Sequence, residues 1–99
     1  MIKKSPGSQP ERVLVTFEFP SSIWAETVHL VGEFNNWNQH SHPLTRRRDE
    51  ENWSITLELS ADREYQFRYL VDGQDWYNDW QADKYVPNNF GGDNSVVVT

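Results

Sequence analysis

The feature that most restricts the fold of this chain is a period-two alternation of apolar and polar residues. In residues 53–59 every second side chain is Trp, Ile or Leu, and in residues 65–71 every second one is Tyr, Phe or Val. Successive side chains of a strand point to opposite faces, so this period predicts strands with one buried face. No segment shows the 3.6-residue period of an amphipathic helix. We expect strands over residues 12–19, 27–33, 53–59, 64–71, 74–77 and 95–99, and a short edge strand over residues 43–48.

Turn-forming residues separate these segments. Pro20 followed by two serines ends the first strand, residues 49–52 turn the chain, and Asp72-Gly73 is typical of a tight turn between antiparallel strands. Residues 78–92 contain a proline and a pair of glycines and are expected to form a long loop. Six or seven short strands with regular turns predict an all-β fold, an antiparallel β-sandwich of the immunoglobulin-like kind.

Length and charge limit the number of domains and the kinds of partner. The 99 residues are expected to form one domain, which we place at residues 12–99, after a flexible N-terminal tail at residues 1–11. The net charge of −6 at pH 7 disfavours nucleic acids and anionic membrane surfaces as partners. The lysines of the tail are not followed by an apolar stretch, unlike those of a secretory signal, so a cytoplasmic location is expected.

Residues suited to catalysis or metal binding form no recognisable pattern. The chain has no cysteine and no Gly-x-Ser-x-Gly motif, and its 15 acidic residues supply too many carboxylate pairs for any one to be informative. His40 and His42 lack a third ligand at a suitable spacing, and the aspartates between residues 72 and 83 lack the Glu that closes a calcium loop. We therefore expect solvated surface groups, no metal, no cofactor and no enzymatic activity of the chain's own.

Aromatic residues are more informative, because they are abundant in a polar chain. They make up 14% of the residues, five of them are tryptophan, and yet the mean hydropathy is −0.81. A small domain cannot easily bury five indoles, so some are expected at the surface, where a cluster of them marks a binding face. Trp53 is in phase with the core face of its strand and is expected in the core, whereas the pattern leaves Trp24 open.

Three other tryptophans lie in or beside predicted turns. Trp37 follows a pair of asparagines, and Trp76 and Trp80 lie close to the Asp-Gly turn. An indole face covers the C–H face of a sugar ring, and nearby amides and charged donors bind the hydroxyl groups at its rim. Suitable donors in the sequence are Asn36, Asn94 and Arg68, the last of which alternates with core residues and is expected to be exposed.

Three segments in order resemble one known family. They are residues 28–37 (VHLVGEFNNW), residues 65–74 (YQFRYLVDGQ) and the run from residue 83 to residue 96. Together they are similar to the family 48 carbohydrate-binding modules, the glycogen-binding or isoamylase N-terminal early-set domains. Such domains accompany glycoside hydrolases, precede branching and debranching enzymes, and occur in the β subunit of AMP-activated protein kinase. The resemblance extends over about residues 12–99.

The resemblance also implies which positions bind sugar. The first stacking tryptophan of the family corresponds to Trp37, and the second corresponds to Trp76, displaced by the extra residue Asp75. Arg68 stands in place of a lysine, so its planar donor fork differs in geometry from the ammonium group of the family. Gly92 stands in place of a threonine and lacks its hydroxyl. The other implied positions are Phe90 and Asn94, with Asn36 and Trp80 as further candidates.

By resemblance, then, this is a non-catalytic module that binds an α-glucan of the glycogen or starch type through a shallow aromatic site. Its expected partners are the polysaccharide or a malto-oligosaccharide, and a glycogen-metabolising enzyme. Many modules of this family instead pack against a catalytic domain and bind no sugar. The alternative is therefore a protein-interaction or regulatory module, and the departures from the family at Arg68, Gly92 and Asp75 keep it open.

Overall fold

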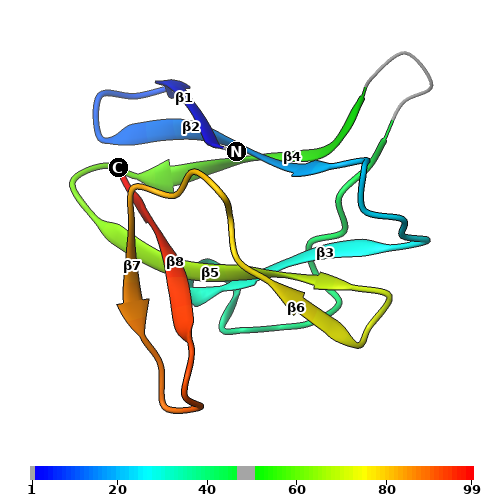
Figure 1. Ribbon diagram of the computed structural model, residues 1–99. Coiled ribbons are helices and arrows are strands. Elements are labelled where there is room, and N and C mark those ends of the chain that lie inside the picture. Colours follow the sequence, from blue (N-terminus) through cyan, green and yellow to red (C-terminus); the bar gives the residue numbers. More distant parts are fainter. Residues whose placement is uncertain (1, 47–50) are drawn as a thin grey trace.

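Two antiparallel sheets packed face to face form the protein (Figure 1). The computed structural model describes residues 2–46 and 51–99. The strands in these ranges are β1 (Ile2–Pro6), β2 (Arg12–Pro20), β3 (Val28–Gly32), β4 (Asn52–Ser60), β5 (Glu64–Val71), β6 (Asp75–Tyr77), β7 (Lys84–Pro87) and β8 (Asp93–Val98), and a short 3-10 helix, η1 (Glu33–Asn35), follows β3. The first sheet has the order β1-β2-β4, and the second has the order β3-β5-β8-β7 with β6 also paired to β5. This arrangement confirms the predicted antiparallel sandwich. Over the same ranges, no helix has both the length and the apolar character that crossing a membrane requires.

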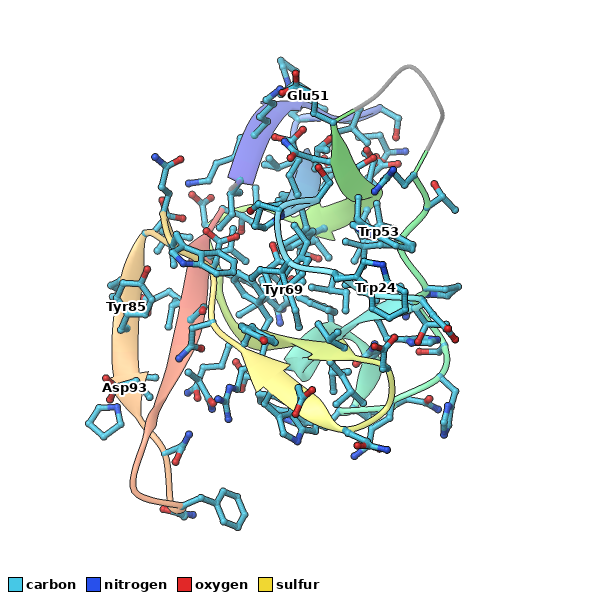
Figure 2. All side chains as sticks on the ribbon, turned by 45° about the vertical axis from the view of Figure 1, so that its right-hand side comes forward. Trp24, Glu51, Trp53, Tyr69, Tyr85 and Asp93 are labelled. Atoms are coloured by element: carbon cyan, nitrogen blue, oxygen red, sulfur yellow. The ribbon has the colours of Figure 1, made fainter. Side chains whose placement is uncertain are left out.

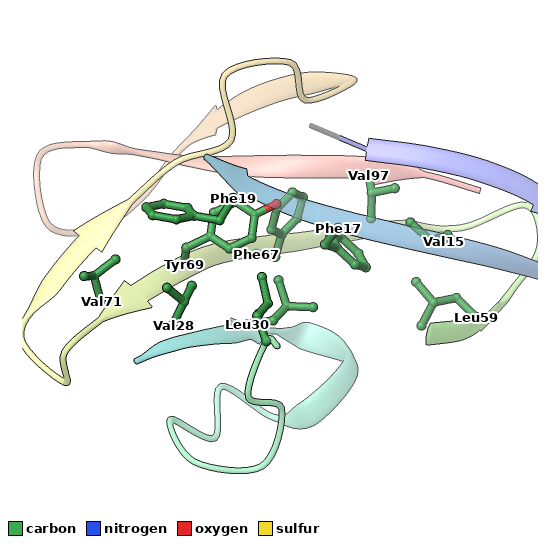
Figure 3. Packing of buried hydrophobic residues seen from close by; sticks show 11 residues of the cluster. Val15, Phe17, Phe19, Val28, Leu30, Leu59, Phe67, Tyr69, Val71 and Val97 are labelled. Carbon is green, nitrogen blue, oxygen red and sulfur yellow. The ribbon is translucent and has the colours of Figure 1, made fainter. Parts of the chain in front are cut away.

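The core lies between the two sheets and contains the alternate residues of the sequence pattern. Phe17 on β2 and Phe67 on β5 meet across the sandwich, with ring centroids 5.0 Å apart (Figure 3). Phe19 packs on Tyr69 with a centroid distance of 5.2 Å. Trp53 packs against the same cluster from β4, as the sequence predicted. The buried cluster consists of Val15, Phe17, Phe19, Val28, Leu30, Leu44, Leu59, Phe67, Tyr69, Val71 and Val97.

The N-terminal residues do not form the tail that the sequence predicted. Ile2–Pro6 form β1, which pairs with β2 over its whole length. The side chain of Ile2 packs against the core cluster, and Lys4 Nζ lies 2.7 Å from the carboxylate of Asp83. An edge strand is paired on one side alone, so a polar and basic composition is compatible with it. Polarity alone therefore does not indicate irregular structure here, because β2 supplies the hydrogen-bonding partner of this segment.

Two other segments differ from the predictions. Residues 78–92 are not one long loop, because Lys84–Pro87 form β7 and pair with β8. Residues 43–46 make isolated bridges, from Pro43 to His29 and from Thr45 to Ser54, and form no edge strand. The remaining residues of that predicted strand, 47 and 48, lie outside the described ranges.

The loop between β6 and β7 is held by a buried aspartate. Asp79 is 1% exposed and accepts hydrogen bonds at 2.7 Å from the Tyr69 hydroxyl and from the backbone N–H of Gln81. The backbone N–H of Asp79 donates to Ser95 Oγ at 2.8 Å. Burial, followed by the charge of Asp79, raises the pKa of Tyr69 well above its ordinary value, so the hydroxyl keeps the proton it donates. These bonds hold the loop at the edge of the sandwich.

Candidate functional site

The side of the second sheet that is turned away from the core carries three of the predicted site residues, Arg68, Trp76 and Asn94. On β5 the residues Phe67 and Tyr69 face the core, so Gln66 and Arg68 face outward. Cross-strand pairing fixes which residues join them, because directly opposed residues share a face. The centre of the outer face defined in this way includes Val31, Gln66, Arg68, Leu70, Trp76, Asn94 and Val96. Of these, Val31, Leu70 and Val96 are buried and form an apolar floor.

Arg68 and Trp76 are in contact on this face. Cζ of Arg68 lies 5.8 Å from the centroid of the Trp76 ring, within the range of a cation–π interaction. Trp76 is opposite Leu70, which makes it the diagonal neighbour of Arg68 across β5 and β6. Its indole remains 38% exposed. Arg68 is half-buried and its Nε is shielded from solvent, which corrects the prediction that this side chain is exposed.

Asn94 is held beside this pair by neighbouring amides. Its Nδ2 donates to Gln66 Oε1 at 3.0 Å, and its Oδ1 accepts from Asn88 Nδ2 at 3.3 Å. Asn88 Oδ1 in turn accepts from the backbone N–H groups of Phe90 and Gly92 at 2.8 and 3.2 Å, so it shapes the turn between β7 and β8. Sequence reasoning missed Gln66 and Asn88. The position of Gln66, two residues before Arg68 on one strand, was a signal that could have identified it.

Trp37 follows η1, at the end of the strand that lies next to β5. Its backbone N–H donates to the carbonyl of Gly32 at 2.8 Å, and its indole is 39% exposed. Asn36 and Trp37 both have left-handed backbone conformations, with φ of 55° and 58°. Non-glycine residues rarely adopt this conformation, and such positions cluster at functional sites. The Asn35 side chain supports the turn by donating to the carbonyl of Leu30 at 3.0 Å.

Two other predicted site residues lie away from the Arg68–Trp76 contact. Phe90 is at the tip of the β7–β8 turn and is 94% exposed. Trp80 packs on Phe19 and Tyr77, with centroid distances of 5.6 and 6.2 Å. Because Phe19 and Tyr77 face the core, Trp80 lies at the edge of the sandwich and does not extend the outer face. The structure therefore sets Trp80, a further candidate from the sequence, apart from the Arg68–Trp76 contact.

The histidines lie near the loop that carries Trp37. His42 Nδ1 is 2.7 Å from Ser41 Oγ, and the rings of His29 and His40 are 6.2 Å apart. In the described residues, no group of three or more side chains is arranged to hold a metal ion. Burial, and then the neighbouring His40, lower the pKa of His29.

The pKa of His29 predicts that acid destabilises this part of the fold. In the unfolded chain His29 takes up a proton near pH 6.5, whereas in the folded protein it does so at a lower pH. The contribution of His29 to stability is therefore present above about pH 6.5 and decreases as the pH falls through the lowered pKa. We expect the free energy of unfolding to fall between pH 7.5 and 5 more steeply in the wild type than in His29→Gln. Urea titrations at several pH values measure this difference, and parallel profiles would contradict it.

Most of the chain is similar to one known family. The family description "Carbohydrate-binding module 48 (Isoamylase N-terminal domain)" matches residues 11–86. This chain belongs to carbohydrate-binding module family 48. The resemblance to that family is thereby confirmed, since the match includes the first two segments and ends within the third. Residues 68, 76 and 94, which the resemblance implied for sugar binding, lie together on the outer face.

Individual relatives place the family 48 module within larger proteins. It is 37% identical to 5'-AMP-activated protein kinase subunit beta-1 of Sus scrofa over 70 residues. That match covers 71% of this chain and 52% of the subunit. It is 27% identical to the 1,4-alpha-glucan branching enzyme GlgB of Butyrivibrio fibrisolvens over 83 residues. That match covers 81% of this chain and 13% of the enzyme. The module thus spans about half or less of these relatives.

Among solved structures, the module is similar to part of the enterobactin esterase FES from Shigella flexneri. The TM-score is 0.77 at 12% sequence identity, and the match covers 98% of this chain and 32% of the esterase. At this level of identity the likeness concerns the fold alone.

Proposed function

We propose that this module binds an α-glucan of the glycogen or starch type at its outer face and catalyses no reaction. The observation that carries the proposal is the contact of Arg68 with a partly exposed Trp76, next to the bonded amides of Asn94 and Gln66. An aromatic surface with neighbouring donors and acceptors suits a glucose ring, whose C–H face is apolar and whose rim carries hydroxyl groups.

In this proposal the side chains have different roles. Trp76 and Trp37 stack on glucose units, Arg68 and Asn94 bond to hydroxyl groups, and Phe90 presses against the glucan chain. The contact with Arg68 also restricts the Trp76 indole before the sugar binds, which lowers the entropy cost of binding. The site is a surface and not an enclosed cleft, so we expect a dissociation constant in the region of micromolar to millimolar.

Removal of either stacking indole tests this proposal. We expect Trp37→Ala and Trp76→Ala each to weaken binding about tenfold or more, which corresponds to about 1.4 kcal/mol. Retention on immobilised glycogen and titration with maltoheptaose, followed by NMR, measure the loss. Trp24→Ala is the matched control, because Trp24 is 78% exposed and lies away from the outer face, near Trp53 (Figure 2).

The control is expected to bind as the wild type does. If both site variants are retained on glycogen as well as the wild type, the outer face is not the glucan site. Circular dichroism of each variant separates a loss of binding from a loss of folding.

A protein-interaction role is the second candidate, and one observation favours it. Trp24, Arg46 and Trp53 line a cavity of about 370 Å³, and tryptophan is enriched among interface hot spots. If the wild type does not respond to millimolar maltoheptaose, association with a glycogen-metabolising enzyme becomes the better proposal. We take the cytoplasm as the place of action in either case, and cell fractionation tests that expectation.

A further inference from the structure

A cavity of about 460 Å³ lies at the edge of the sandwich. In the described residues, β1 pairs with β2 as far as Phe17, whereas β2 continues to Pro20. The last residues of β2 therefore extend beyond β1. The loop between β6 and β7 lies against this end of β2, where Trp80 packs on Phe19, and contributes Trp80 and Gln81 to the cavity wall. The volume is in the range of small-ligand pockets, about 300–1,000 Å³.

Trp80 forms a rigid aromatic wall in this cavity. Its ring is stacked on that of Tyr77, with 27° between the planes, and also packs on Phe19 at 5.6 Å. The indole is nevertheless 53% exposed. The residues on either side, Asp79 and Gln81, are tied down by the hydrogen bonds of the buried aspartate. A ligand that stacks on Trp80 therefore meets a platform that is already ordered.

Four polar residues line the cavity beside Trp80. Besides Pro20 and Ile23, the cavity is lined by Glu18, Ser22, Asn52 and Gln81, residues whose side chains carry a carboxylate, a hydroxyl and two amides. Amides both donate and accept hydrogen bonds, and a carboxylate accepts them from hydroxyl groups, so this set matches a ligand rich in hydroxyls. Lys3 Nζ lies 3.6 Å from Glu18, and with a net charge of −6 the chain disfavours anionic ligands. The chemistry therefore indicates a neutral sugar.

The cavity is separate from the outer face. Trp76 and Tyr77 are consecutive residues of β6, so their side chains point to opposite sides of the sheet. Trp76 contacts Arg68 on the outer face, whereas Tyr77 stacks on Trp80 on the core side. One ring of a glucan cannot contact both indoles.

We infer that this cavity is a second carbohydrate site, in which Trp80 stacks on one glucose unit of an α-glucan. Glu18, Asn52 and Gln81 bond to the hydroxyl groups of that unit. The identity of the sugar rests on the proposed function, whereas the location of the site rests on the cavity alone. Two weak sites on one module bind a branched polymer more tightly than either does by itself, because the second contact is intramolecular.

The indole N–H signals of the five tryptophans provide the test, because each reports on its own surroundings. The full chain is titrated with maltoheptaose to about 20 mM, well above the weak affinities expected of open sites. We expect a saturable shift of the Trp80 signal that persists in Trp37→Ala/Trp76→Ala. We also expect Gln81→Ala and Asn52→Ala to raise the dissociation constant reported by Trp80 about threefold or more and to leave that reported by Trp76 unchanged. These two variants keep the Trp80 platform and its packing.

The outcomes separate the two sites. Saturable shifts at Trp37 and Trp76 without one at Trp80 overturn the second site and leave the proposed function in place; the cavity is then a candidate for a protein partner. A shift at Trp80 alone supports the second site and overturns the outer-face proposal. A Trp80 shift that is linear and no larger than that of Trp24 indicates non-specific contact and overturns the inference.

Discussion

Phe17→Ala is expected to lower the free energy of unfolding by about 3–5 kcal/mol, the largest effect of any single truncation proposed for this protein. Phe17 is fully buried at the centre of β2, and its ring contacts Phe34 at 5.6 Å and Phe67 at 5.0 Å. Its removal loses the burial of an aromatic ring and leaves a cavity that the two sheets cannot close without moving. A domain of this size has a total stability of about 5–15 kcal/mol, so much of that reserve disappears.

Urea unfolding followed by tryptophan fluorescence measures this effect. Thr16→Ala is the matched control, because Thr16 is the next residue and its hydroxyl bonds to that of Thr56 at 2.8 Å on the exposed side of the same sheet. We expect the control to cost about 1 kcal/mol or less. A Phe17→Ala protein as stable as the Thr16→Ala protein would show that the core is not where the cluster of aromatic rings places it.

Gly32→Ala is expected to cost about 3 kcal/mol and to weaken glucan binding as well. Gly32 is buried, and a Cβ at this position would lie 2.6 Å from the carbonyl oxygen of Gln66 and 2.8 Å from Cβ of Phe67. Because one of these atoms is backbone, strand β3 or β5 has to shift. The carbonyl of Gly32 accepts the backbone N–H of Trp37, so the shift also displaces the turn that presents this indole.

Gly92→Ala is a suitable control for this substitution, since the nearest atom to its added Cβ is Asn88 Nδ2 at 3.7 Å. Denaturant titration and glycogen retention are measured on both variants. Equal stability and equal retention of the two would contradict the tight approach of β3 to β5 at Gly32. Loss of stability with full retention would show that the Trp37 turn does not depend on this contact.

The outer face was predictable in part, because strand alternation and a tight turn are patterns of residues close together in the chain. Because neighbouring side chains of a strand point to opposite faces, Arg68 is predicted to face away from Phe67 and the core. In the structure both side chains lie on the predicted sides. The Asp72-Gly73 turn brings β6 back against β5, which sets Trp76 on the same face as Arg68. Whether Arg68 is exposed depends on what lies over it, and that is Trp76, a residue of another strand.

The sequence by itself determined β2, β3, β4, β5, β6 and β8 and their buried faces, because period-two alternation and turn residues are local patterns. Its motifs also identified the family. Only the tertiary structure decided that Ile2–Pro6 form a strand, since β2 supplies its hydrogen-bonding partner. The tertiary structure also decided where Trp80 lies. Its place depends on Phe19, far away in the sequence, and on the buried bond between Tyr69 and Asp79. Contacts between distant residues have no local pattern, so the two aromatic surfaces of this module could not be told apart until the fold brought those residues together.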